Sequence, residues 1–243
     1  MPKKRIHKPR KNSSKGDGST LSTRVEAELQ HALMAGRLRP NQRLTIAEIA
    51  ANYGTSITPV REALLRLAAI GAIEFRRATS VSVPLLDEAG YTEICEIRKS
   101  LEGLAAERAA VLCSANDIAE LSQIFSDYHR AKAKRDVTLA LELNWRFRFK
   151  LYQCAAMPRL MEQIRNNWLL IGPLFNFLYP ALNPEKAYEA EYSSIIDGLN
   201  RRDASAVRAA VVRAIDVGSE RVRPFIHSVA SGQSGLSGEL WLS

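Results

Sequence analysis

The sequence predicts a mainly α protein, with an N-terminal winged helix-turn-helix and a small β-hairpin followed by an all-α helical bundle of six or seven helices. Three observations support this fold class. Residues 44–71 carry two short helical patterns joined at Gly54, residues 73–83 alternate like a hairpin, and later residues keep helical apolar spacing nearly to the end. We expect four segments: a disordered basic tail over 1–19, a winged helix-turn-helix domain over 20–84, an all-α domain over 85–227 and a disordered tail over 228–243.

The first of these segments is strongly basic. Residues 1–15 hold seven Lys or Arg side chains and no acid, whereas residues 84–243 hold 19 basic and 20 acidic ones, so the net charge of +8 lies in the N-terminal part. A run of this kind either contacts DNA phosphates or remains a solvated tail. A polyanionic partner would therefore meet the N-terminal part of the chain.

A first helix is expected over residues 20–35, where apolar residues recur every four positions and Gly36 follows. Two shorter helices should follow over 44–71, with Gly54 in the turn between them because it lacks a Cβ where two helices approach closely. Ser56 or Thr58 can cap the second of these helices, and Pro59 suits its first turn. The residues that we expect these two helices to bury are Ile46, Ile49, Ala50, Val60, Leu64 and Leu67.

The hairpin is expected to pair residues 73–75 with 81–83 through a turn over 76–80, which places Arg76 and Arg77 at its tip. A winged helix-turn-helix places its second helix in the DNA major groove and its wing near the backbone. The sequence therefore predicts DNA binding. The alternative is a three-helix subdomain with a purely structural role.

These segments resemble the start of the GntR family of bacterial transcription regulators. The resemblance is carried by residues 36–40, 43–44, 58–64 and 67–71. It implies a DNA-binding surface, for which we expect contacts from Arg43, Thr58, Arg61, Arg76 and Arg77. Two positions depart from the family pattern: Ile57 stands where an Arg is usual, and Ser80 where the wing has Gly. Ile57 predicts a weaker phosphate or guanine contact, or an apolar contact with a thymine methyl group.

Beyond residue 90 we expect only helices. Asp87, Asn116, Asp136 and Asp203 are the expected first residues or caps of four of them. Pro158 and Pro184 should begin two more, a break is expected at residues 172–173, and the last long helix should end near Pro224. The order of these helices, with residues 98–102 near the start and 144–148 in the middle, resembles the ligand-sensing domain of the FadR-like branch of the same family.

Many members of that branch bind a divalent metal inside the bundle through one Asp and three His. Here the corresponding positions are Asn144, Arg148, Tyr192 and Ala214, so we expect neither a metal ion nor another cofactor. A guanidinium can hold a carboxylate directly through two parallel hydrogen bonds. We therefore expect Arg148, assisted by Asn144 and Tyr192, to bind an organic acid or another small anionic metabolite.

Two alternatives remain open for the sensor. Arg148 could instead pair internally with an acid such as Glu191, which would leave a bundle without a ligand. Arg98 could reach the ligand from the first bundle helix, or could form an ordinary surface pair with Glu102, which the sequence favours.

The remaining features exclude several classes of function. Three cysteines without metal or disulfide spacing suit a reducing cytosol, no apolar run can span a membrane, and no phosphate loop or nucleophile motif indicates an enzyme. The sequence predicts a cytoplasmic homodimer that binds near-palindromic double-stranded operator DNA and responds to an anionic metabolite. The rivals are a constitutive DNA-binding dimer with a vestigial sensor and, with less support, a helical metal-dependent enzyme.

Overall fold

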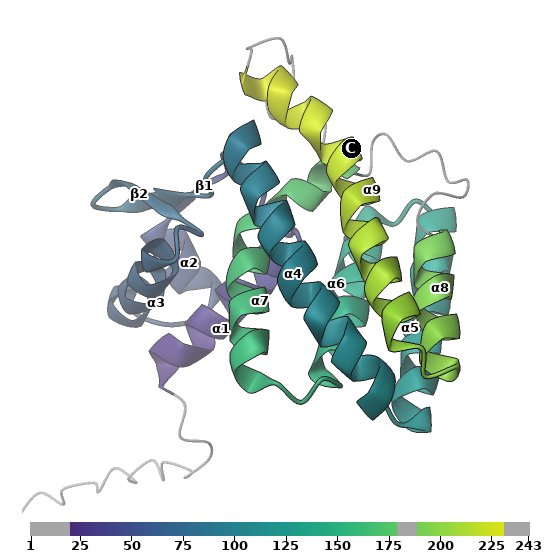
Figure 1. The fold of residues 1–243 in the computed structure, drawn as a ribbon. Coiled ribbons are helices and arrows are strands. Elements are labelled where there is room, and N and C mark those ends of the chain that lie inside the picture. Colours follow the sequence, from purple (N-terminus) through teal and green to yellow (C-terminus); the bar gives the residue numbers. More distant parts are fainter. Residues whose placement is uncertain (1–19, 179–188, 231–243) are drawn as a thin grey trace, which may run out of the picture.

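The computed structural model of the chain describes residues 20–178 and 189–230, and these residues form two adjoining domains (Figure 1). The N-terminal domain, at the left of Figure 1, contains α1 (Leu21–Met34), β1 (Arg43–Thr45), α2 (Ile46–Asn52), α3 (Ile57–Ala69), β2 (Glu74–Arg77) and β3 (Ser80–Ser82). The bundle contains α4 (Glu88–Leu112), α5 (Ala115–Ala133), α6 (Val137–Gln153), α7 (Pro158–Ile171), the 3-10 helix η1 (Gly172–Leu178), α8 (Glu189–Asn200) and α9 (Ala204–Ala230). The predicted fold class is confirmed.

The N-terminal domain is held by one small apolar core. Leu33 of α1 and Leu64 and Leu67 of α3 have at most 1% of their surface exposed, which follows from their helical spacing. Thr45 and Glu48 form a reciprocal capping box that begins α2, because each side chain accepts a hydrogen bond from the other residue's backbone N–H. These contacts fix the angle at which α3 is presented.

The wing differs from the sequence expectation in two respects. It is a three-stranded sheet in the order β1-β3-β2, and the short strand β1, in which Leu44 pairs with Val81, was not predicted. The turn covers only residues 78–79, so the expected turn over 76–80 was wrong, and Arg76 and Arg77 lie on β2. Three residues are too few to show alternation, and β1 exists because β3 offers it a second edge.

The bundle is built around α4, which packs on α6, α7 and α9. The expected caps are present at Asp87, which accepts from the Gly90 N–H (2.8 Å), and at Asp136, which accepts from the Leu139 N–H (3.0 Å). Helix α5 begins one residue earlier than expected, because Ser114 and Asp117 form a capping box. The break at Gly172 is also present, as η1.

The last helix corrects one expectation. Helix α9 does not end near Pro224 but continues to Ala230. Val222 and Ile226 are buried on either side of Pro224, so apolar packing outweighs the backbone hydrogen bond that proline cannot donate. The predicted helix start at Pro184 and both terminal tails, apart from residues 228–230 of α9, lie outside the described residues.

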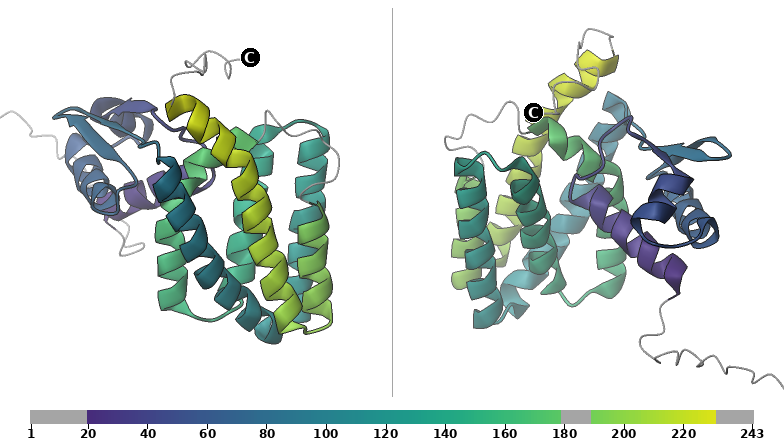
Figure 2. Two further views of the ribbon diagram at one scale, coloured as in Figure 1. Left: turned by 45° about the horizontal axis from the view of Figure 1, so that its top comes forward. Right: turned by 180° about the vertical axis from the view of Figure 1, so that it is seen from behind.

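The two domains meet where α1 lies against the end of α7 and η1 (Figure 2). A Cβ built on Gly172 would lie 2.4 Å from the Leu33 carbonyl oxygen and 2.7 Å from the Met34 Cα. Only glycine permits this close approach of two backbones. The bundle therefore supports the winged domain through a specific contact.

Candidate DNA-binding surface and buried ligand site

The first candidate site is the outer side of α3. Val60, Leu64 and Leu67 face the core, so the opposite side of the helix is exposed to solvent. Thr58 and Arg61 lie on that side, and Ile57 at the helix start has 52% of its surface exposed. Ser56 is the N-cap residue, although its side chain makes no capping hydrogen bond.

The wing turn is linked to this helix through Arg61, whose Nη1 donates a hydrogen bond to the Ala78 carbonyl (2.8 Å). On β2, Arg76 donates to the Ser82 hydroxyl (2.7 Å) and forms an ion pair with Glu74 (3.0 Å). Helix and wing border an open, shallow hollow of about 280 Å³, lined by Arg61, Leu65, Phe75, Arg76, Arg77 and Ala78. The structure thus brings three of the five expected DNA-contacting residues together.

The other two lie on the same domain but apart from that hollow. Thr58 is exposed on α3, nearly one turn before Arg61. Arg43 is exposed on β1, which is separated from β2 by β3. An arginine there can contact a different stretch of DNA backbone from Arg76 and Arg77.

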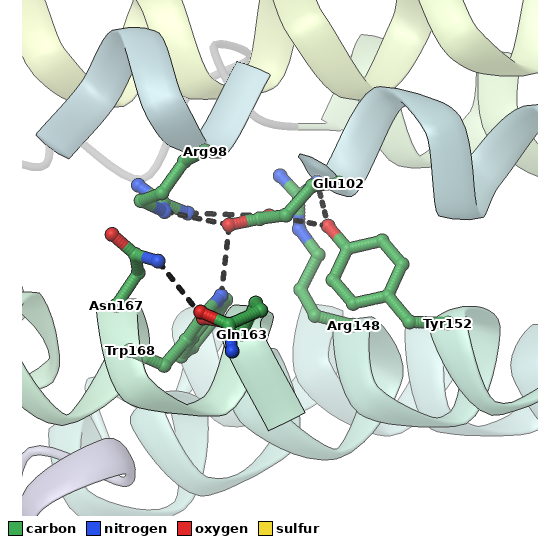
Figure 3. Close-up of polar contacts among 7 residues, drawn as sticks. All are labelled: Arg98, Glu102, Arg148, Tyr152, Gln163, Asn167 and Trp168. Carbon is green, nitrogen blue, oxygen red and sulfur yellow. Dashed lines mark hydrogen bonds and ion pairs between the residues drawn. The ribbon is translucent and has the colours of Figure 1, made fainter. Parts of the chain in front are cut away.

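The second candidate site is a buried polar network between α4, α6 and α7 (Figure 3). At its centre the Glu102 carboxylate, fully buried, accepts hydrogen bonds from Arg98 Nε (2.6 Å), the Tyr152 hydroxyl (2.5 Å) and Trp168 Nε1 (2.9 Å). Arg148 Nη1 donates to the Tyr152 hydroxyl (3.3 Å). The favoured expectation of an exposed Arg98–Glu102 pair was therefore wrong, because α6 and α7 cover that side of α4.

The charges of this network do not balance. Arg98 and Arg148, each 4% exposed, are two guanidinium cations beside one carboxylate. Burial opposes the Arg98 cation, yet its pKa is raised because Glu102 lies against it. Burial and the Glu102 charge raise the pKa of Tyr152, so its hydroxyl keeps its proton and donates it to Glu102. The described network carries one excess positive charge.

The three residues expected around the ligand do converge. Tyr192 of α8 donates a hydrogen bond to Asn144 Oδ1, and the Arg148 guanidinium carbon lies 5.4 Å from the centre of the Tyr192 ring. Arg98 reaches the same network through Glu102 and Tyr152. Glu191 is not the partner of Arg148 seen here, and its Oε2 atom is buried without a hydrogen-bond partner among residues 20–178 and 189–230.

The four positions that resemble a metal site do not fit a divalent cation. Asn144 can offer only its amide oxygen, which accepts from Tyr192, and Ala214 offers no ligand atom. Arg148 places a cation where a ligand would be needed. Within residues 20–178 and 189–230, no group of three or more His, Cys, Asp or Glu side chains could hold a metal ion.

Sequence reasoning missed the central roles of Glu102, Tyr152 and Trp168. A signal for Tyr152 was present, because Asn144, Arg148 and Tyr152 are each four residues apart and share one face of α6. No comparable signal joined Glu102 to Trp168, which are 66 residues apart along the chain.

Two family models match the chain. The model described as bacterial regulatory proteins, gntR family, matches residues 21–83, and the FCD domain model matches residues 93–217. The HTH-type transcriptional regulator McbR of Escherichia coli is 35% identical over 191 residues, which cover 78% of this chain and 86% of McbR. The HTH-type transcriptional repressor RspR of the same organism is 25% identical over 199 residues, covering 82% and 86% of the two chains.

A solved structure agrees with these matches. The structure of E. coli McbR/YncC superposes with a TM-score of 0.75 at 31% identity, covering 89% of this chain and all of the other. None of the helices in the described part of the chain is long and apolar enough to cross a bilayer.

Proposed function

The chain belongs to the GntR family of bacterial transcription regulators and carries an FCD domain, and from this premise we propose that the FCD domain senses a small anionic metabolite. The matched relatives are named as transcription regulators, so the chain is a DNA-binding regulator and not an enzyme. The proposed effector is an organic acid that changes the affinity of the winged domain for operator DNA.

The observation that carries this proposal is the excess positive charge around Arg148. A buried cation is costly unless an opposite charge accompanies it, and one carboxylate serves both Arg98 and Arg148. A carboxylate ligand would supply the missing negative charge and accept two parallel hydrogen bonds from Arg148. Asn144 and Tyr192 would orient it, and we propose that no metal ion takes part.

On the DNA side, we propose that Thr58 and Arg61 approach the major groove from the start of α3. Arg76 and Arg77 on the wing, and Arg43 on β1, would contact phosphates and so fix the position of the domain without reading sequence. The exposed Ile57 side chain suits the methyl group of a thymine.

We also propose that two copies pair through α4, which runs along the front of the bundle in Figure 1. Ile97, Leu104 and Val111 are 40%, 37% and 62% exposed and recur every seven residues on its outer side. A two-fold axis between Ser100 and Leu101 would place Ile97 of one copy opposite Leu104 of the other.

The charges on this face match under the same axis. Glu93 and Arg108, both exposed, are equally far from it, so Glu93 of each copy would meet Arg108 of the other. The change Glu93→Arg should therefore weaken the dimer in sedimentation experiments, and the swap Glu93→Arg with Arg108→Glu should restore it. A swap that sediments like the single variant would count against this surface.

The experiment for the effector is calorimetric titration of the full chain with a panel of mono- and dicarboxylic acids, with operator affinity measured in parallel on duplexes selected from a random pool. We expect one acid to bind and to change operator affinity. Arg148→Gln should abolish acid binding, whereas Arg159→Gln, an exposed arginine at the start of α7, should not.

Two results would reject the proposal. Acid binding that survives in Arg148→Gln would place the effector elsewhere. A parent protein that binds operator but none of the acids would instead favour the constitutive regulator with a vestigial sensor.

A further inference from the structure

A recess between the two domains is lined by three arginines that the function proposed above does not use. Its volume is about 520 Å³, within the usual range for small-molecule sites. Its polar walls come from Arg37 and Arg39 in the winged domain and from Arg135, Asp136 and Asn176 in the bundle. The recess therefore draws on both domains.

Hydrogen bonds across the junction hold these walls in place. Asn176 Nδ2 donates across the junction to the Gly36 carbonyl oxygen (2.7 Å) and, within η1, to the Pro173 carbonyl oxygen (2.9 Å). Glu142 accepts from Arg37 (2.9 Å) and contacts His31 Nε2 (3.0 Å). The shape of the recess thus depends on how α1 sits against η1 and α6, which Figure 2 shows from two sides.

Arginines outnumber carboxylates in the lining, and one of them, Arg37, is already paired with Glu142. Three guanidinium groups line the recess, and the single carboxylate, that of Asp136, accepts the Leu139 N–H as the N-cap of α6. Val137 and Thr138 add the N-terminal end of this 17-residue helix, which carries partial positive charge. Like charges on facing walls repel, so an anion between them would stabilise the junction.

We propose that this recess is a second effector site, for a small anion with two or more negative charges. Organic phosphates and polycarboxylates share that chemistry, and arginine binds both through paired hydrogen bonds. Such an anion would contact Arg37 and Arg39 on one domain and Arg135 on the other. It would bind most tightly to the arrangement in which these residues face each other, and so would couple its own binding to the position of the winged domain.

The test is calorimetric titration of the full chain with inorganic pyrophosphate and, separately, with citrate, at constant ionic strength set with chloride. We expect one saturable site per chain, with affinity at least about tenfold lower in Arg135→Gln and in Arg39→Gln. Arg159→Gln, an exposed arginine that does not line the recess, should bind like the parent. Binding of pyrophosphate alone would assign the site to phosphates, and binding of both probes to polyanions in general.

Arg148→Gln separates this site from the one inside the bundle, since it should leave pyrophosphate binding unchanged. Absence of saturable binding at millimolar concentration would overturn the proposal. The proposal would also be overturned if Arg159→Gln lost as much anion affinity as the lining variants. That result would mean that anion binding depends only on the net charge of the protein. Finally, an Arg135→Gln variant that keeps its anion affinity but shows a weaker salt dependence of DNA binding would assign that arginine to DNA phosphate.

Discussion

The two domains use arginine in opposite ways. In the winged domain Arg76 pairs with Glu74 at the surface, where each side chain is about half exposed (48% and 49%), whereas in the bundle Arg98 pairs with Glu102 at 5% and 0% exposure. Surface cations remain hydrated and can exchange their partners for DNA phosphates at little cost. Buried cations are fixed by folding, so their partners decide both the stability of the bundle and which ligand it accepts.

The largest effect on stability should come from disrupting the buried ion pair between Arg98 and Glu102. Glu102→Gln keeps the shape of the side chain but leaves Arg98 without its carboxylate, so the free energy of unfolding should fall by at least about 3 kcal/mol. Urea denaturation measures this. The control is Glu107→Gln, which breaks the half-exposed ion pair with Arg208 and should cost less than about 1 kcal/mol.

A double variant sharpens the same point. If the cost in Glu102→Gln comes from an unpaired buried cation, then Arg98→Met combined with Glu102→Leu should recover much of the lost stability. If the double variant were as unstable as Glu102→Gln, the loss of stability would come from the missing hydrogen bonds of Tyr152 and Trp168 to the Glu102 carboxylate. It would not come from the unpaired Arg98 cation.

The next largest effect on stability concerns the contact between the two domains at Gly172. In Gly172→Ala the new methyl group would meet the Leu33 carbonyl at 2.4 Å, and the backbones of α1 and η1 would have to separate. We expect a loss of about 1–3 kcal/mol in unfolding free energy together with altered operator affinity. Gly103→Ala on α4 is the matched control, because its Cβ would meet only side-chain atoms at ordinary contact distance, Arg208 Cγ at 3.4 Å and Val212 Cγ2 at 3.5 Å. It should be neutral or slightly stabilising, and an equal loss in both variants would refute the junction argument.

A smaller effect tests an ion pair of intermediate exposure. Hydrogen bonds from Lys150 and from Ser114 hold the pKa of Asp117 well below its usual value. A carboxyl group with a lowered pKa in the folded state stabilises the fold above its unfolded-state pKa of about 3.9, and this contribution is lost as pH falls. Asp117→Asn should therefore cost about 1 kcal/mol at pH 7, and the difference from the parent should shrink in denaturation curves below pH 4. A difference that stays constant with pH would mean that capping geometry, and not charge, is responsible.

The same contrast explains what the sequence could predict. Helix α3 was found because its apolar spacing, its proline and its flanking glycines are local signals. Strand β1 was missed because three residues show no alternation, and the burial of Arg98 and Glu102 was missed because it depends on α6 and α7, which lie far along the chain. Local patterns report elements and caps, whereas the environment of a charge is set by which distant elements cover it.

The smallest effect on stability should come from the surface side of the comparison. Arg77 is exposed on β2, so Arg77→Ala should change the free energy of unfolding by no more than about 0.5 kcal/mol. Its loss should nevertheless remove one phosphate contact and reduce the slope of log affinity against log salt by about one unit, with equal weakening on all DNA sequences. Fluorescence anisotropy over a chloride series measures this slope. If Arg77→Ala instead changed the preferred DNA sequence, the wing would contact bases. The wing arginines would then take part in sequence recognition, which is here assigned to residues of α3, and would do more than fix the position of the domain on DNA.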